Sequence, residues 1–272
     1  MSRAHVNGID VSYERDGAGP RVLFLNGSGA TLEEMAPLLG VLRSRFDLLA
    51  HDQRGLGRTE VPEGPYSMAD YAQDAIALLD EIGWESCRVV GISFGGMVAQ
   101  EMAVTVPDRV ERLALLCTSP GGADHASYPL HELEDLSADD RANIQLEIMD
   151  TRFDAAWLAE HPADRAFVEA AAERWRRPRS DEQRRGEREQ LHARRDHDVV
   201  DRLGRITGPV LVAAGRFDGI APPANSEVIA AAVPNAELRL YEGGHLFIVQ
   251  DRRALPEIMD FLSAGDVGPG PA

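Results

Sequence analysis

The chain of 272 residues has no lysine, only two cysteines and no long apolar run. Its 28 basic residues are therefore all arginines, which excludes lysine Schiff-base chemistry and a P-loop lysine. Two cysteines, Cys87 and Cys117, cannot build a disulfide scaffold, and their apolar neighbours predict small buried side chains in a reducing compartment. The first residues lack a signal-like apolar segment and no run reaches membrane-spanning length, so we expect a cytoplasmic protein with no membrane partner.

Positive charge is also scarce, because 28 basic residues face 45 acidic ones and give a formal net charge of −17. Nucleic-acid binding needs clustered positive charge, so this balance disfavours a nucleic-acid partner, and it disfavours an anionic membrane surface for the same reason. Hydrophobic residues make up 44% and charged residues 27% of the chain, as in folded globular proteins. We expect one large domain, or one domain with an insertion, that binds a small molecule; a homodimer is left open.

Short apolar runs alternate with helix-period segments through most of the chain. Strict alternation over residues 9–14, after Asn7-Gly8, predicts an opening antiparallel hairpin. Later runs lack alternation, as strands buried on both faces of a parallel sheet do, and they cover residues 22–25, 47–50, 88–92, 113–117 and 209–214. Helices are predicted over residues 68–82, 94–106, 226–233 and 251–262. This order predicts an α/β fold with a mostly parallel, doubly wound sheet.

One long segment, residues 122–205, shows helical patterns and many charges but no strand pattern. We interpret it as a helical cap, or lid, inserted into a core of residues 1–121 and 206–272, whose last residues, 264–272, are expected to form a frayed tail. Arginines crowd residues 174–195, which fits either an anion site or a solvated helix face. Interleaved acidic residues favour the solvated face with ion pairs one turn apart.

The strongest local motif is Gly91-Ile-Ser93-Phe-Gly95, which follows an apolar run and opens a predicted helix. Gly-x-Ser-x-Gly in a strand–turn–helix context is typical of a nucleophile elbow. The flanking glycines are required because side chains would clash in so sharp a turn. The motif therefore predicts an exposed Ser93 hydroxyl at a helix N-terminus, where the helix dipole favours developing negative charge.

A serine nucleophile needs a base and an orienting acid, which in this arrangement follow the serine in the order acid, then histidine. Asp218 and His245 each come directly after a predicted strand, at the edge of the sheet where active sites gather. Asp124 is an alternative acid, but Asp218 lies closer to its strand end. His51 precedes the serine. The remaining histidines are interpreted as surface or cap polarity: His5, His125, His131, His161, His192 and His197.

Two backbone amides are expected to form an oxyanion hole. One is the amide of Phe94, directly after the nucleophile, and the other is that of Ser28, in the glycine-containing loop over residues 25–29. The segment Asp52-Gln-Arg54-Gly-Leu-Gly-Arg-Thr59 is interpreted as a structural loop whose aspartate and arginine brace the floor of the site.

Together these residues resemble the α/β-hydrolase superfamily over nearly the whole chain. The resemblance rests on Asn26-Gly-Ser-Gly29, Asp52-Gln-Arg-Gly-Leu-Gly-Arg58, Gly91-Ile-Ser-Phe-Gly-Gly96, Gly215-Arg-Phe-Asp218 and Gly243-Gly-His245. It is closest to the cofactor-free, lidded esterases and enol-lactonases and to the haloperoxidase-like perhydrolases. The resemblance implies an α/β-hydrolase fold with Ser93, His245 and Asp218 as catalytic triad, a cap over the pocket, and no metal or organic cofactor.

The expected activity is hydrolysis of a small carboxylic ester or lactone. Asn26 stands where many members have histidine, as in enol-lactonase-like members, and a serine nucleophile argues against haloalkane dehalogenases and epoxide hydrolases. C–C bond hydrolysis, perhydrolysis, and a lyase or cyclisation step remain alternatives, as does a non-catalytic small-molecule receptor. The residues expected to line the substrate pocket are Asn26, Leu146, Met149, Phe153, Trp157, Phe167 and Trp175.

Overall fold

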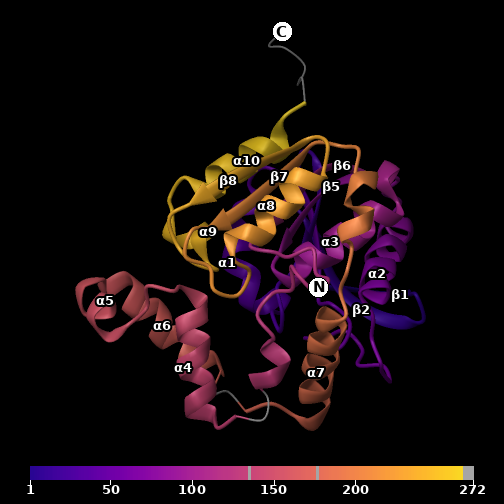
Figure 1. Ribbon diagram of the computed structural model, residues 1–272. Coiled ribbons are helices and arrows are strands. Elements are labelled where there is room, and N and C mark those ends of the chain that lie inside the picture. Colours follow the sequence, from indigo (N-terminus) through magenta and orange to yellow (C-terminus); the bar gives the residue numbers. More distant parts are fainter. Residues whose placement is uncertain (134–135, 176–177, 266–272) are drawn as a thin grey trace.

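The centre of the molecule is one sheet with the strand order β1-β2-β4-β3-β5-β6-β7-β8 (Figure 1). The computed structural model describes residues 1–133, 136–175 and 178–265. The strands are β1 (Ser2–Val6), β2 (Ile9–Asp16), β3 (Arg21–Leu25), β4 (Asp47–His51), β5 (Cys87–Ile92), β6 (Val110–Leu116), β7 (Val210–Gly215) and β8 (Ala236–Tyr241). The first two strands form the predicted hairpin, β2 pairs antiparallel with β4, and all other neighbours are parallel.

Helices cover both faces of the sheet, which confirms the predicted doubly wound fold. On one face α2 (Met68–Glu81), α3 (Phe94–Thr105) and α8 (Pro223–Ala232) pack on one core cluster. On the other face α1 (Leu32–Arg43), α9 (Phe247–Gln250) and α10 (Ala254–Ser263) pack on a second cluster. Every residue of β5 and β7 is buried, as the lack of alternation in their sequences predicts.

The segment between β6 and β7 contributes no strand to the sheet in the part of the chain that the structure describes. It forms α4 (Ala138–Met149), α5 (Ala155–Glu160), α6 (Pro162–Trp175) and α7 (Asp181–Arg195), with short 3₁₀ turns at Leu130–Leu133 and Val200–Arg205. Helices α5 and α6 project away from the sheet, whereas α7 lies beside the 3₁₀ turn at Leu130–Leu133 (Figure 1). Val199 and Leu203 belong to the core cluster, so the last turn of the predicted cap packs with the core.

Two further sequence expectations concern the ends and the membrane. Of the expected tail, residues 266–272 lie outside the described residues, and Ala264 and Gly265 follow the last turn of α10. Within the described part of the chain, no helix combines the length and the apolar character needed to cross a bilayer. Cys87 and Cys117 are both buried free thiols, as their apolar neighbours predict.

Candidate active site

Ser93 sits in the sharp turn between β5 and α3, with backbone angles of φ 54° and ψ −114°. Its amide donates a hydrogen bond to the Leu116 carbonyl (2.8 Å), and Thr118 Oγ1 donates to its carbonyl (2.8 Å). A side chain at Gly95 would collide with the Leu25 carbonyl, and one at Gly91 with the Gly95 carbonyl. The motif therefore needs glycine at both positions, and this backbone holds the serine in a strained conformation.

The structure brings Ser93, His245 and Asp218 into one hydrogen-bonded chain. His245 Nε2 lies 3.0 Å from Ser93 Oγ, and His245 Nδ1 lies 2.8 Å from Asp218 Oδ2. The other oxygen, Asp218 Oδ1, accepts the amides of Ile220 (2.8 Å) and Ala221 (2.9 Å). With the Nδ1 proton donated to the carboxylate, Nε2 can accept the serine proton. The alternative acid, Asp124, is exposed.

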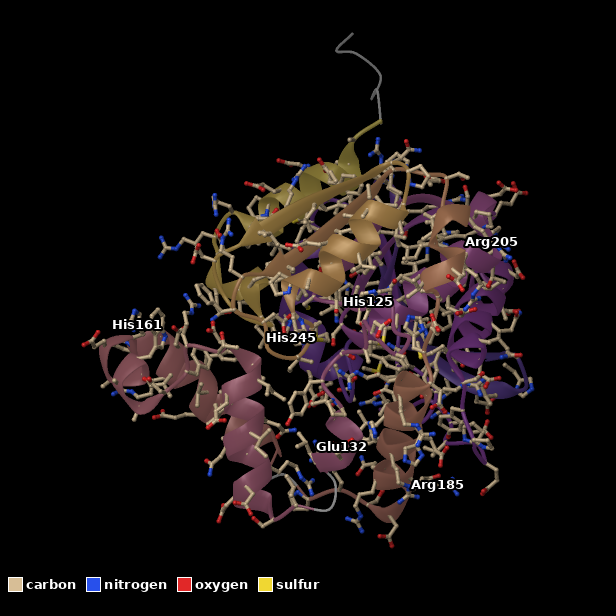
Figure 2. All side chains as sticks on the ribbon, in the orientation of Figure 1. His125, Glu132, His161, Arg185, Arg205 and His245 are labelled. Carbon is tan, nitrogen blue, oxygen red and sulfur yellow. The ribbon has the colours of Figure 1, made fainter. Side chains whose placement is uncertain are left out.

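The end of α4 holds the loops that carry the histidine and the acid. The Met149 carbonyl accepts the His245 amide (2.6 Å), and the Ile148 carbonyl accepts the Gly219 amide (2.9 Å). Gln250 Nε2 donates to the fully buried Asp150 carboxylate (3.0 Å). Sequence reasoning missed this support because it comes mostly from backbone carbonyls, which no side-chain pattern marks. Figure 2 shows His245 lying between the sheet and α4.

The two amides expected in the oxyanion hole, those of Ser28 and Phe94, make no hydrogen bond to other described residues. The loop that carries Ser28 is held by α7, because Gln190 Oε1 accepts a hydrogen bond from the neighbouring Gly29 amide (2.7 Å). The side chain of Asn26 is fully buried, and its Nδ2 donates to the His51 carbonyl (3.4 Å). This hydrogen bond ties the start of the loop over residues 25–29 to the end of β4.

The loop after β4 is hydrogen-bonded to the start of α1, which follows the loop that carries Ser28. The buried Asp52 carboxylate accepts the Leu32 amide (2.7 Å) at the start of α1 and the Arg58 amide (3.0 Å). Arg54 forms a bidentate pair with the buried Asp74, at 2.7 Å for both hydrogen bonds. Burial raises the pKa of both carboxyl groups above its ordinary value, against the hydrogen bonds that lower it. These contacts agree with the structural role expected for the loop.

Cys117 packs directly against the acid and the base. Its Sγ lies within 4.8 Å of ligand atoms of Asp218 and His245. Burial raises the pKa of the Cys117 thiol well above its usual value, so the group stays a neutral thiol at neutral pH. Because both Asp218 oxygens already accept N–H donors, these three groups fit a packed hydrogen-bonded site better than a metal site.

The apolar cap residues expected in the pocket occupy different places. Phe153 is buried, whereas Leu146, Met149, Phe167 and Trp157 are partly exposed. Trp157 stacks on His161 at a ring distance of 3.7 Å and donates to Asp164 (2.8 Å), so it packs within the α5–α6 pair. The side chain of Trp175 lies outside the described residues. Among these cap residues, as far as the structure describes them, Met149 alone forms a hydrogen bond with a triad residue, and it does so through its backbone carbonyl.

Two residues of the cap correct the sequence interpretation. Arg194, within the arginine-rich stretch expected on a solvated face, is only 5% exposed, and His197 is only 3% exposed. The charge pattern does not distinguish Arg194 from its neighbour Arg195. In the structure Arg195 is exposed, as expected, and pairs with Asp196 (2.7 Å). His51 is buried as well, at 2% exposure. Burial lowers the pKa of both His51 and His197 to about 4.

Comparisons with known proteins agree with this architecture. Residues 20–251 match the family model described as alpha/beta hydrolase fold. The chain is 32% identical over 269 residues to a Variovorax paradoxus protein named provisionally as the carbamate hydrolase RutD, covering 94% of this chain and 97% of that one. It is 30% identical over 246 residues to the poly(3-hydroxyalkanoate) depolymerase of Ectopseudomonas oleovorans, covering 89% and 83%. The enol-lactonase of Burkholderia xenovorans has a similar structure, with a TM-score of 0.80, 25% identity, and coverage of 96% and 100%.

Proposed function

Since the chain belongs to the α/β-hydrolase fold family, we propose that it is a serine hydrolase that cleaves a small carboxylic ester or lactone. The observation that carries this proposal is the hydrogen-bonded chain from Ser93 Oγ through His245 to Asp218, at 3.0 and 2.8 Å. The similarity to an enol-lactonase supports an ester-type bond, because a lactone is a cyclic ester.

The geometry supports acyl transfer in two steps. His245 takes the Ser93 proton as Oγ attacks the substrate carbonyl, and Asp218 stabilises the imidazolium that forms. The Ser28 and Phe94 amides receive the developing oxyanion; by analogy, one such donor contributes about 3–4 kcal/mol. The imidazolium then protonates the leaving oxygen, and His245 activates a water that hydrolyses the acyl-enzyme. No step requires a metal or an organic cofactor.

A carbamate is a second candidate substrate. The relative with 32% identity bears the name of a carbamate hydrolase, and the coverage of both chains is nearly complete. The same serine can attack a carbamate carbonyl with the same base and oxyanion hole. In a carbamate ester a nitrogen replaces the acyl carbon that is bonded to the carbonyl of an ester. An ester and a carbamate ester can share the same alkoxide leaving group; they differ in the acyl side, which must fit the pocket, and hydrolysis of either depends on Ser93.

Labelling with a fluorophosphonate probe tests the nucleophile directly. We expect Ser93 to be modified in the wild-type protein, and the label to be lost in Ser93→Ala and greatly reduced in His245→Ala. The substrate panel contains 4-nitrophenyl esters, 4-nitrophenyl carbamates and lactones. On the substrate that is hydrolysed fastest, Ser93→Ala should lower kcat by roughly 10⁴–10⁶-fold. A folded wild-type protein that does not label, or a Ser93→Ala variant that loses only a few-fold in kcat, would refute the proposal.

A further inference from the structure

The end of α4 and the turn that follows it pack against both loops that carry the acid and the base. The Thr151 amide donates to the Phe217 carbonyl (2.9 Å) in the loop of the acid. A Cβ at Gly244, in the loop of the base, would lie 2.1 Å from the Met149 carbonyl. A contact this close leaves no room for a side chain, so the cap backbone and the two loops form one packed unit.

The side chain at the centre of this unit is Asp150, whose carboxylate is fully buried. Its Oδ1 accepts the backbone amide (3.1 Å) and Nε (2.8 Å) of Arg152, and its Oδ2 accepts Arg152 Nη2 (2.6 Å). Oδ2 also accepts from Gln250 Nε2 (3.0 Å). A buried carboxylate is unfavourable unless an opposite charge and hydrogen bonds compensate it, so these partners are held in place around it.

Gln250 connects this carboxylate to the base. Its Nε2 donates to Asp150, and its Oε1 accepts the Gly244 amide (2.9 Å), directly before His245 in the chain. An ionised carboxylate can only accept and a backbone N–H can only donate, so both hydrogen bonds are lost if the Gln250 amide is turned over. The glutamine side chain is therefore held in one orientation between the cap and the histidine loop.

Arg152 connects the same carboxylate to the acid. Its guanidinium carbon lies 4.0 Å from the centre of the Phe217 ring and 4.5 Å from that of Trp157, within the range of cation–π contacts. Phe217 directly precedes Asp218 in the chain. Asp150 therefore has one partner at each of the two loops.

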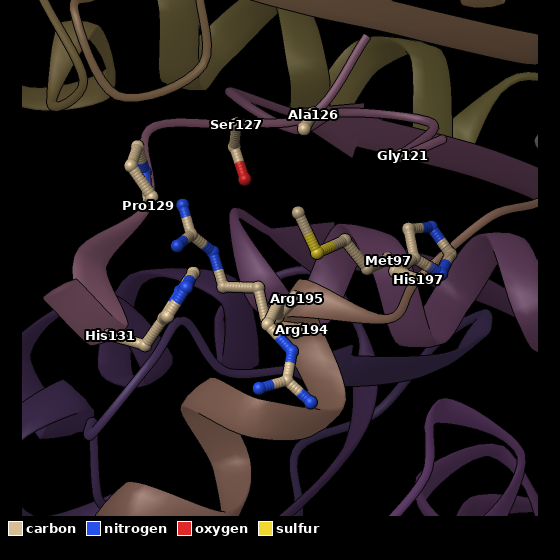
Figure 3. Close-up of a pocket in the computed structure, with 9 residues that line it drawn as sticks. All are labelled: Met97, Gly121, Ala126, Ser127, Pro129, His131, Arg194, Arg195 and His197. Atoms are coloured by element: carbon tan, nitrogen blue, oxygen red, sulfur yellow. The ribbon is translucent and has the colours of Figure 1, made fainter. Parts of the chain in front are cut away.

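Asp150, Arg152 and Gln250 do not line the small cavity beside the first turn of α3, which has a volume of about 70 Å³ (Figure 3). Their polar atoms are bonded to one another and to the loop of the base. These contacts point to a role in the geometry of the triad and not in ligand binding.

We propose that Gln250 and Asp150 are positioning residues of the active site, which set the place of the His245 ring relative to Ser93 and Asp218. They act on the base and not on the substrate. The triad distances of 3.0 and 2.8 Å leave little tolerance, since a displacement of about 1 Å can lower a rate about 100-fold. The proposal rests on the function proposed above, in which His245 is the base.

Gln250→Met tests the link to the base, because it removes both hydrogen bonds, keeps the length of the side chain and adds no charge. On the fastest substrate of the panel above, we expect kcat to fall by about 10- to 100-fold and KM to change less than about 3-fold. The base is displaced in this variant while the substrate pocket is kept. The rate at which the fluorophosphonate labels Ser93 should fall with kcat.

An exchange of the two functional groups tests the contact itself. In Asp150→Asn the new amide NH₂ faces another donor in either orientation, and in Gln250→Glu two carboxyl groups meet. Each single variant should lose about 10-fold or more in kcat. In the double variant the new carboxylate can accept both from the Gly244 amide and from the new NH₂, so kcat should recover to within about 5-fold of wild type.

Glu101→Gln is the matched control for the loss of a buried charge. Glu101 is buried and forms a bidentate pair with Arg202 (2.6 and 2.7 Å), which joins α3 to the 3₁₀ turn at Val200–Arg205. Its kcat should stay within about 2-fold of the wild-type value, because neither loop of the acid or the base is part of this pair.

Amide hydrogen exchange measures the positioning without a catalytic readout. In Gln250→Met the Gly244 amide loses its acceptor, so it and the His245 amide should exchange at least about 10-fold faster than in wild type. The proposal is refuted if these rates are unchanged, if Gln250→Met keeps kcat within about 2-fold, or if the double variant is no faster than the slower single variant. Failure of wild-type Ser93 to label refutes the catalytic proposal, and the exchange rates still decide whether Gln250 holds the histidine loop.

Discussion

At the scale of single residues, the orientation of Asp218 predicts a large effect from a small change. One of its oxygens accepts two backbone amides and the other accepts from His245 Nδ1. In Asp218→Asn a single carbonyl oxygen remains. If this oxygen accepts the backbone amides, the new NH₂ group faces His245 Nδ1 and the ring proton moves to Nε2. The protonated Nε2 can then no longer accept the serine proton. We expect kcat on an activated ester to fall about 10⁴-fold, by analogy with other triads.

Asp124→Asn is the matched control, since Asp124 is an exposed acid in the alternative position after β6. Its kcat should stay within about 2-fold of the wild-type value. Retention of more than a tenth of the activity in Asp218→Asn, or a larger loss in Asp124→Asn, would mean that the acid has been assigned to the wrong residue.

The residues that could be predicted from the sequence are those whose chemistry dictates a local motif. Ser93 needs glycines at fixed spacing, and Asp218 and His245 must follow strands, so each leaves a mark in the sequence. Arg194 leaves none, because it and Arg195 are adjacent arginines in one charged helix. Only the packing of α7 on the segment after β6 decides which of the two is buried.

At the scale of elements, two helical glycines predict opposite effects of the same substitution. Gly40, in α1, is exposed and has open space around it, whereas a Cβ at Gly186, in α7, would collide with the Gly55 backbone. We expect Gly40→Ala to raise the free energy of unfolding by about 0.5–1 kcal/mol, because alanine is the better helix former. Gly186→Ala should lower it by roughly 1–3 kcal/mol through overpacking.

Chemical denaturation measures both changes, and activity separates them further. Displacing α7 also disturbs Gln190, which holds the oxyanion loop, so Gly186→Ala should lower kcat/KM as well, whereas Gly40→Ala should leave it unchanged. Equal effects of the two substitutions on stability would show that α7 does not approach the loop after β4 as closely as described.

Helix α1 also shows where element prediction from sequence fails. It contains Pro37 and Gly40, which interrupt the helical pattern, so the sequence does not predict a helix there. Its start is nevertheless fixed by a capping box between Thr31 and Glu34, and by the Asp52 carboxylate, which accepts the Leu32 amide. That last contact joins residues 20 positions apart, so it is a property of the folded chain and cannot be seen in a local pattern.

At the scale of the whole molecule, two buried histidines tie the stability of the fold to pH. Burial lowers the pKa of His51 and His197 to about 4 in the folded protein, against about 6.5 in an unfolded chain. Between these values the unfolded state binds protons that the folded state does not, so stability falls as the pH falls. Asp52 and Asp74 act in the opposite direction at the acid end, because burial raises their pKa values and the folded state protonates first.

We therefore expect the free energy of unfolding to fall between pH 6.5 and 4.5, by about 2 kcal/mol for each histidine. His51→Gln and His197→Gln should each reduce this loss, and the double variant should reduce it most, because glutamine binds no proton in this range. Urea denaturation at pH 8, 6.5, 5.5 and 4.5 measures the slope, and the values at pH 8, where both histidines are neutral in both states, correct for any change in packing. A double variant that loses as much stability as wild type would show that other groups carry the pH dependence and that these two imidazoles are not buried as described.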